Sequence, residues 1–439
     1  MEYELRDPIH KRITFDAFER SVIDHPFFQR LRFISQLSFL QTYVYPGGMH
    51  DRFTHALGAM HVAGRLFARL VASSDALTHR LTAVEIESLR RRVRLAGLLH
   101  DLGHGPFSHA SESVFPRFND LPLDWSWWKN KEDRQAKHED YSVLLVQTMG
   151  REGVFSTEMA QDIASLIHGS IAPSAWFTRI EEKAPTLQRV LKALISGEVD
   201  CDRMDYLLRD SYYCGVAYGQ YDLDWLISSL GIAEQDGRLI FTISENGVRA
   251  FEDLLLARYH MIDQVYFHKT KAGFAHYLEQ AILTKEINLP IPTDPYAYAD
   301  LRDGKVIEQL FAAAKDKRCY WSYHLMRRLP AKHLLRIHDA VEEDRRQHID
   351  LEQTCRELGV RYFTHAAAGQ LSQFGEGAES NSLLAVSKKT ARGRAYVSIF
   401  DYSDLLQKYN EKIRFTDFFI RREDVETFKT GRGSVVENC

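Results

Sequence analysis

Apolar residues recur at helical spacing along most of this chain. Phe53, Leu57, Met60 and Phe67 mark one face of a helix expected over residues 53–73. A second apolar stripe on the same segment begins with His55. Because more than one face is apolar, the pattern predicts a central, buried helix that carries His55 into the interior.

The next helix has a clear start and a clear stop. Thr82 and Glu85 have the spacing of a capping box, which predicts that the helix begins there. Its buried face is marked at intervals of three and four residues by Ile86, Leu89, Val93 and Ala96. His100 continues this face, and the Gly and Pro residues of segment 103–106 then break the helix.

Further helices follow, with little strand. A long helix is expected from Leu187 through Glu198 to Asp202, and another over residues 248–283. Residues 239–243, 395–402 and 415–420 have the pattern of short strands. The Trp-rich stretch around residues 125–128 is interpreted as a packed surface flap in preference to a binding lid. The pattern predicts a mainly α fold with a small α+β C-terminal lobe.

Composition narrows the class of protein. A net charge of -4 argues against a nucleic-acid coat, which usually carries a basic surplus. The five cysteines lack CxxC spacing, which fits a reducing compartment and offers no cysteine zinc site. The acidic N-terminus does not resemble a signal peptide, and no apolar run is long enough to span a membrane. We therefore expect a cytoplasmic protein with no membrane partner, and nucleic acid is not expected as a partner.

Histidine and aspartate meet on the predicted buried faces. A lone buried histidine is usually a hydrogen-bonded core residue, but at His100 a carboxylate, Asp101, follows directly. A buried unpaired charge is costly, and a bound cation would satisfy both residues. His55 and Asp202 supply further ligand types on two other segments. Two imidazoles and two carboxylates suit Mn, Fe, Ni, Co or Zn, and Mg less readily.

The order of these motifs resembles a known family. Segments 51–55 (Asp-Arg-Phe-Thr-His), 98–104 (Leu-Leu-His-Asp-Leu-Gly-His) and 199–206 (Val-Asp-Cys-Asp-Arg-Met-Asp-Tyr) are similar to the motifs of the HD-domain phosphohydrolases. The chain most resembles the dNTP triphosphohydrolases of the SAM-and-HD-domain type, although no SAM domain precedes the match. The resemblance covers residues 5–280 well and 290–340 more loosely. It implies an HD-domain helical bundle over 1–285, then a helical extension and the α+β lobe over 286–439.

The resemblance also implies roles for single residues. The metal would be held by His55, His100, Asp101 and Asp202. The α-phosphate would be lined by His104, His109 and His138, with Glu139 following as in the family. His109 would protonate the departing 5′ oxygen and Glu112 would orient it. Histidine suits this transfer because its usual pKa lies near neutrality.

Other matching residues would bind the substrate. Arg52, Arg203 and Arg258 would clamp the triphosphate with forked guanidinium donors, although the family carries lysine where this chain has Arg203. The sugar and its surroundings would be contacted by Gln36, Leu37, Tyr206, Asp210 and Tyr266. Of these, Gln36 and Asp210 would bind the 3′-hydroxyl, and the two tyrosines would crowd the 2′ carbon and favour deoxyribose.

The implied reaction is hydrolysis of a dNTP at the α-phosphorus, which yields a deoxynucleoside and inorganic triphosphate. One alternative is an HD phosphohydrolase that acts on another nucleotide or on single-stranded nucleic acid. A second alternative, from a different class, is a nucleotide-sensing regulatory protein without catalysis. The intact ligand set argues against the sensor, because a lapsed site could lose its carboxylates.

Regulation is implied at two places. Asp24, Gln29 and Arg32 match the family's guanine-nucleotide site at subunit contacts, which predicts a GTP or dGTP effector and a homo-oligomer, either tetramer or dimer. A structural ion pair between Asp24 and Arg32 is the alternative. Of the basic second effector site only Lys269 remains, so allosteric binding of a dNTP there is not expected.

Overall fold

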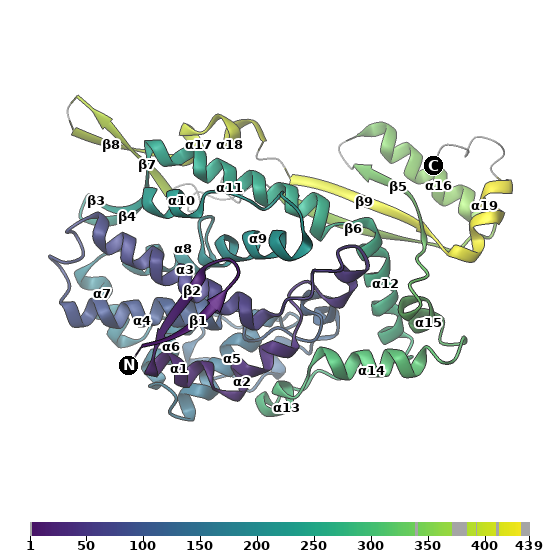
Figure 1. The fold of residues 1–439 in the computed structure, drawn as a ribbon, viewed down its shortest axis with the longest axis horizontal. Helices are drawn as coiled ribbons and strands as arrows, with labels where there is room; N and C mark the ends of the chain where they lie inside the picture. Colours follow the sequence, from purple (N-terminus) through teal and green to yellow (C-terminus); the bar gives the residue numbers. More distant parts are fainter. Residues whose placement is uncertain (1, 339–340, 371–383, 392, 410–411, 432–439) are drawn as a thin grey trace.

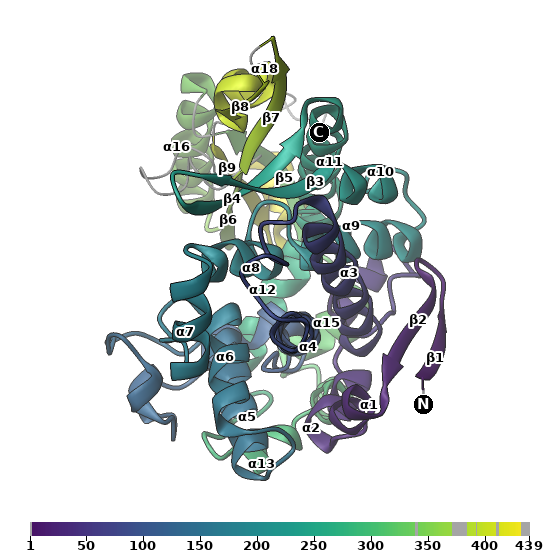
Figure 2. The ribbon, with the colours of Figure 1, turned by 90° about the vertical axis from the view of Figure 1, so that its left-hand side faces the viewer.

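The computed structural model describes residues 2–338, 341–370, 384–391, 393–409 and 412–431. Helices dominate it, and the strands form three small sheets (Figures 1 and 2). The predicted mainly α fold with β structure near the C-terminus is confirmed. Among the described residues, no helix combines the length and apolarity needed to cross a membrane.

Two long helices form the centre of the molecule. The helix α3 (Arg52–Ser73) begins at Asp51, whose side chain accepts from the Thr54 backbone N–H. The helix α4 (Ala83–Leu99) begins with the predicted capping box. A Cβ at Gly97 would lie 2.9 Å from Ala63 Cβ, so glycine lets the two helices approach closely. This close contact sets His55 of α3 beside His100, which caps the end of α4.

Further helices surround this pair. Before α3 lie α1 (Ala17–Ile23) and α2 (Pro26–Gln29). After α4 come α5 (His138–Arg151), α6 (Thr157–Ile167), α7 (Ala175–Lys183), α8 (Leu187–Ser196), α9 (Cys201–Cys214), α10 (Leu223–Ser229), α11 (Val248–Met261), α12 (Lys269–Leu283), α13 (Pro295–Ala299), α14 (Asp303–Ala313) and α15 (Tyr320–Met326). The Trp-rich segment between α4 and α5 is packed, with Trp127 and Trp128 buried, as expected for a flap.

Two helices predicted as continuous are broken. The helix from Leu187 ends at Ser196, and α9 begins afresh because Asp200 caps it, accepting from the Arg203 backbone N–H. The prediction of one helix through Asp202 was therefore wrong. The helix over 248–283 is also interrupted, by a π-helical turn (Ile262–Tyr266) and by His268, which caps α12. Such π turns are frequent at functional sites.

The sheets are small and distinct. The N-terminal hairpin pairs β1 (Glu2–Asp7) with β2 (Lys11–Asp16). The second sheet has the order β3-β4-β7-β8, from β3 (Leu230–Gln235), β4 (Arg238–Ser244), β7 (Leu384–Thr390) and β8 (Gly393–Ser398). The third has the order β5-β9-β6, from β5 (Lys332–His338), β6 (Tyr362–Gln370) and β9 (Lys412–Ile420). The helices near these strands are α16 (Glu342–Glu357), α17 (Ile399–Tyr402), α18 (Asp404–Tyr409) and α19 (Val425–Gly431).

The C-terminal part of the chain returns to the helical core. Strand β7 pairs in parallel with β4, although about 140 residues separate them in the sequence. The strand expected over 395–402 ends at Ser398, because that side chain caps α17. The strand expected over 415–420 lies within β9. The division at residue 285 stays a prediction.

Candidate metal centre and substrate pocket

Four predicted ligands from three segments meet at one point. One ligand atom from each of His55, His100, Asp101 and Asp202 lies within 4.8 Å of the others. The Nε2 atom of His55 lies 3.0 Å from Asp202 Oδ1 and 3.5 Å from Asp101 Oδ2. His100 Nε2 lies 3.3 Å from an oxygen of each aspartate. Imidazole nitrogens and carboxylate oxygens that face a common centre at these distances have the arrangement of a cation site.

The second nitrogen of each imidazole is already engaged. His100 Nδ1 lies 2.9 Å from the Gly97 carbonyl oxygen and donates to it. His55 Nδ1 lies 2.7 Å from Asp205 Oδ2. This leaves both Nε2 atoms as buried groups that make no hydrogen bond within the described part of the chain. A divalent cation fits these four residues, because it would satisfy both orphaned nitrogens and both carboxylates.

Charge at the site points the same way. Burial lowers the pKa of His55, but the carboxylates of Asp202 and Asp205 outweigh burial and raise it to about 10. Burial raises the pKa of Asp101, but Arg52 and two imidazoles hold it well below its usual range. The carboxylates are thus ionised in a buried place, where they can serve as ligands to a cation that replaces the protons on the imidazoles.

Asp205 supports the site and was missed in the sequence. Its carboxylate accepts two bonds of 2.8 Å from Arg209, one turn further along α9. It also lies 2.7 Å from His10, at the tip of the N-terminal hairpin, and contacts His55 as above. A Cβ at Gly58 would fall 1.8 Å from this carboxylate, so only glycine leaves room for it. The i, i+4 pair of Asp205 and Arg209 was the available sequence signal.

A second cluster adjoins the first. His104, His109, Glu112 and His138 form another group whose polar atoms lie within 4.8 Å of one another. Glu112 Oε1 lies 2.5 Å from His138 Nδ1 and 3.1 Å from His109 Nδ1. The His104 and His138 rings stack at 3.7 Å. Glu112 therefore orients both imidazoles by accepting at Nδ1, which turns their Nε2 atoms outward.

Glycine and backbone contacts fix this cluster. A Cβ at Gly103 would lie 2.1 Å from the His138 carbonyl oxygen, so the turn after α4 packs against the first residue of α5. Arg30 donates to the His104 carbonyl at 2.7 Å. Glu139 follows His138 on α5, with an oxygen 3.6 Å from His138 Nδ1, and does not line the pocket.

The three predicted arginines all line the pocket. Arg52 donates to Asp101 and, at 2.8 Å, to the Ser108 hydroxyl. Glu198 lies between the other two, 3.2 Å from an Arg203 nitrogen and 3.7 Å from an Arg258 nitrogen. The arginines come from α3, α9 and α11, and two of them are held by one carboxylate, Glu198.

The predicted sugar-facing residues form the next wall. The Tyr266 hydroxyl donates to Asp210 Oδ2 at 2.7 Å, and His50 contacts the other Asp210 oxygen at 2.7 Å. The Tyr206 and Tyr266 rings lie 6.1 Å apart. The Gln36 side-chain oxygen is buried and makes no hydrogen bond within the described residues. His50 is a further residue that sequence reasoning missed, and nothing in its local pattern indicated it.

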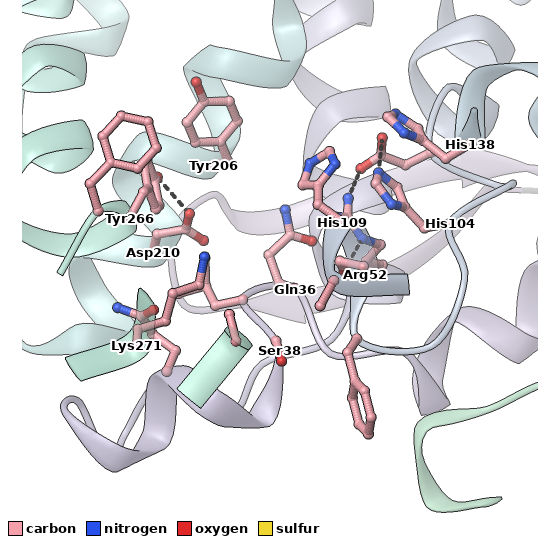
Figure 3. Close-up of a pocket in the computed structure, with 18 of the residues that line it drawn as sticks. Gln36, Ser38, Arg52, His104, His109, His138, Tyr206, Asp210, Tyr266 and Lys271 are labelled. Atoms are coloured by element: carbon pink, nitrogen blue, oxygen red, sulfur yellow. Dashed lines mark hydrogen bonds and ion pairs between the residues drawn. The ribbon is translucent and has the colours of Figure 1, made fainter. Parts of the chain in front are cut away.

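These walls enclose a cavity of about 720 Å³. Leu37 lines it beside Gln36, as predicted. Figure 3 shows the histidines and Arg52 at one end and Tyr266, Asp210 and Lys271 at the other. Sequence reasoning missed several lining residues, namely Ser38, Gln41, Phe267, Lys271, His276, Glu279 and His365. They come from segments whose contact with the pocket depends on tertiary packing.

The predicted regulatory residues lie elsewhere. Asp24 pairs with Arg20 at 3.1 Å, and Arg32 donates to Gln29 at 2.8 Å and stacks on Phe53. The alternative of an ion pair between Asp24 and Arg32 was therefore wrong. Lys269 is exposed at the start of α12 and does not line the pocket.

Comparison with known proteins gives a consistent picture. Residues 52–210 match the HD domain family model. Over 283 residues the chain is 32% identical to an uncharacterized protein of Methanocaldococcus jannaschii, covering 64% of this chain and 49% of that one. Over 291 residues it is 33% identical to an uncharacterized protein of Bacillus subtilis, covering 65% and 55%. It is also 29% identical over 280 residues to the deoxynucleoside triphosphate triphosphohydrolase SAMHD1 of Bos taurus, covering 60% and 44%.

The match to these curated relatives therefore spans about half of their length. Among solved structures, a hypothetical protein from Aquifex aeolicus superposes with a TM-score of 0.71 at 27% identity. That comparison covers 99% of this chain and 100% of the other. A phosphohydrolase from Bacteroides thetaiotaomicron gives a TM-score of 0.69 at 24% identity, with coverage of 96% and 100%, and supports the fold alone.

Proposed function

Residues 52–210 of the chain form an HD domain, and from that premise we propose that the protein is a metal-dependent dNTP triphosphohydrolase. The observation that carries the proposal is the junction of two sites. Asp101 and Asp202 of the four-ligand cluster line a cavity that is also lined by three arginines and by a tyrosine pair beside an aspartate. A nucleoside triphosphate could place its negatively charged phosphates against the metal ligands and arginines and its sugar against the tyrosines and the aspartate.

The triphosphate is assigned to the three arginines that line the cavity. Arg52, Arg203 and Arg258 each carry a planar fork of donors suited to phosphate oxygens. Ser108 holds the Arg52 guanidinium and Glu198 lies between the other two, so the three side chains are positioned before substrate arrives. Catalysis at phosphorus depends mainly on such positioning and charge stabilisation. A divalent cation in the adjoining cluster would add Lewis acidity and lower the pKa of a water molecule.

Protonation of the departing 5′ oxygen is assigned to the cluster of His104, His109, Glu112 and His138. Water adds to the α-phosphorus and loses a proton to the solvent, the bond from phosphorus to the 5′ oxygen breaks, and that oxygen takes a proton from His109, which the solvent then reprotonates. Glu112 accepts at His109 Nδ1, so the opposite nitrogen, Nε2, is the one free to donate. The same carboxylate orients His138, which stacks on His104 and lines the phosphate end of the cavity.

Selection for deoxyribose is assigned to the tyrosines. Tyr206 and Tyr266 face each other across the cavity wall, and the Tyr266 hydroxyl is held by Asp210. A ribose 2′-hydroxyl would enter this crowded face. Gln36 remains available to the 3′-hydroxyl, since its side-chain oxygen makes no hydrogen bond in the described residues. Each Asp210 oxygen already contacts one partner and has a second lone pair for the 3′-hydroxyl.

We extend the proposal to regulation by a guanine nucleotide and to a homo-oligomer. Asp24, Gln29 and Arg32 lie together on the surface around α1 and α2, apart from the cavity. Two of the three side chains are exposed, so they can contact a nucleotide or a second copy of the chain. Native mass spectrometry with and without GTP, combined with the activity assay below, tests both points.

Product analysis tests the central proposal. The purified protein is incubated with each dNTP and Mn²⁺ or Mg²⁺, with and without GTP, and the products are separated by ion exchange. We expect deoxynucleoside and triphosphate from the wild type and from Asp224→Ala, which removes an exposed aspartate that belongs neither to the cluster nor to the cavity lining. Asp101→Ala is expected to give no products.

The other outcomes are equally informative. Monophosphate with pyrophosphate would place the attack on a different bond and contradict the assignment of the phosphate wall. Tight binding of nucleotides with no turnover under any condition would favour a sensor over an enzyme.

A further inference from the structure

The cavity continues past the sugar-facing wall. Along α12 it is lined by Lys271, Ala275 and Glu279, which the spacing of i, i+4 and i+8 places on one face of the helix. Across from α12 it is closed by His365, which lies on β6 of the C-terminal sheet. The proposed reaction at the phosphate end uses none of these residues.

Lys271 is a cation that lacks a partner in this part of the cavity. In the described residues it makes no ion pair and no hydrogen bond, and burial alone lowers its pKa. His365 is close enough to sense its charge, because burial and then Lys271 lower the His365 pKa. A lysine held in a pocket without a counter-charge costs free energy, which a ligand with hydrogen-bond acceptors would recover.

The position of Lys271 decides which part of a nucleotide it meets. Figure 3 shows its side chain on the side of Asp210 and Tyr266, at the opposite end from His104, His109 and His138. The histidine end also holds Arg52 and adjoins the metal cluster through Asp101, which lies 3.3 Å from His104, so the phosphates belong there. A nucleotide with its phosphates there and its sugar at the tyrosines therefore presents its base to Lys271.

We propose that Lys271 reads the base of the substrate and favours guanine, an inference that rests on the proposed function. An ammonium group has three donors and no acceptor. Guanine offers O6 and N7 as adjacent acceptors, whereas adenine replaces O6 with an amino donor. Lys271 can donate to both O6 and N7 of guanine. In adenine it can donate to N7 only, because the amino group in place of O6 is itself a donor.

The same geometry gives the C-terminal lobe a role. His365 brings β6 to the base end of the cavity, and Phe363 on the same strand stacks on His276 of α12 at 3.8 Å. Strand β6 thus forms the wall behind Lys271. The lobe that sequence motifs left without a function completes the base subsite.

Steady-state kinetics with all four dNTPs tests the inference. We compare the wild type with Lys271→Met, which keeps the length and removes the charge, and with Lys271→Arg, which keeps donors. Lys305→Met, an exposed residue of α14 outside the cavity, is the matched control. We expect kcat/KM for dGTP to fall about tenfold or more in Lys271→Met, as for a lost charged hydrogen bond. The value for dATP should change much less, and Lys271→Arg should keep the preference for dGTP.

Two results would overturn the inference. An equal fall for all four dNTPs would mean that Lys271 contacts phosphate, and an unchanged ratio of dGTP to dATP would mean that it contacts no base. Calorimetric titration of chelator-treated protein with deoxyguanosine and deoxyadenosine separates this inference from the proposed function. If no dNTP is hydrolysed, the proposed function fails, yet a preference for deoxyguanosine that disappears in Lys271→Met still supports the base subsite.

Discussion

Asp205→Ala should damage stability and metal binding together. The Asp205 and Arg209 side chains are both fully buried, and the carboxylate accepts two bonds of 2.8 Å from Arg209. Removing one partner of a buried ion pair costs about 3–5 kcal/mol, because the other charge is left buried. The mutation also removes the group that fixes His55 Nδ1 at 2.7 Å. Loss of such a support costs about 10- to 100-fold in metal affinity.

Asp7→Ala is the control that separates the two effects. Asp7 accepts one bond of 2.8 Å from Arg209 and two backbone bonds in the hairpin turn, from Ile9 and His10, and it makes no contact with His55. Because Arg209 keeps both bonds to Asp205, we expect a loss of about 1–3 kcal/mol and unchanged metal affinity.

Two measurements on the same proteins decide the matter. Urea unfolding followed by circular dichroism gives the change in stability, and calorimetric titration of chelator-treated protein with Mn²⁺ gives the affinity. Equal Mn²⁺ affinity in Asp205→Ala and Asp7→Ala would refute the reasoning that Asp205 positions His55. If Asp205→Ala does not fold, Asp205→Asn provides the same comparison with a smaller perturbation.

Three further results are expected. His61 has a pKa lowered to about 4 by burial and by His10, below about 6.5 when unfolded. Between these two pKa values the unfolded chain binds more protons than the folded chain, so the free energy of unfolding should fall as the pH drops from 6.5 to 4. The fall should be smaller in His61→Gln. Identical urea midpoints in both proteins across that range would count against this explanation. Gly103→Ala should destabilise by at least about 1–3 kcal/mol because its Cβ meets backbone, whereas Gly304→Ala, with open space around it, should not; similar unfolding midpoints would contradict the packing argument. Glu112→Gln should lower kcat by about 10²- to 10⁴-fold with Mn²⁺ affinity unchanged, and an unchanged kcat would remove Glu112 from the proton path.

Local sequence patterns were sufficient for the central helices. Residues 53–73 and the capping box at Thr82 obey rules of spacing and hydrogen bonding that act within a few residues, and both helices form as predicted. The ligand types His55, His100, Asp101 and Asp202 could be named because buried charge needs an explanation. Their convergence within 4.8 Å is a property of the packing of three segments.

The features that the local sequence patterns failed to predict depend on longer-range contacts and on capping. The break between α8 and α9 depends on Asp200, whose capping bond competes with continuation of the helix. Lys271 and His365 are unremarkable in their own segments, and only the meeting of α12 with β6 places them in one cavity. The partners of Asp205 span 195 residues of sequence, a separation that no local rule reaches.

The tie between His10 and Asp205 also sets an order of events during synthesis. The hairpin tip leaves the ribosome 195 residues before its carboxylate partner. At about 5–20 residues per second, that interval lasts about 10–40 s. Until Asp205 emerges, His10 and His55 lack the acceptor that holds them, and without Asp202 the nascent chain cannot complete the four-ligand cluster. The hairpin tip therefore docks only after α9 has been synthesised, and metal binding by all four ligands cannot precede that step.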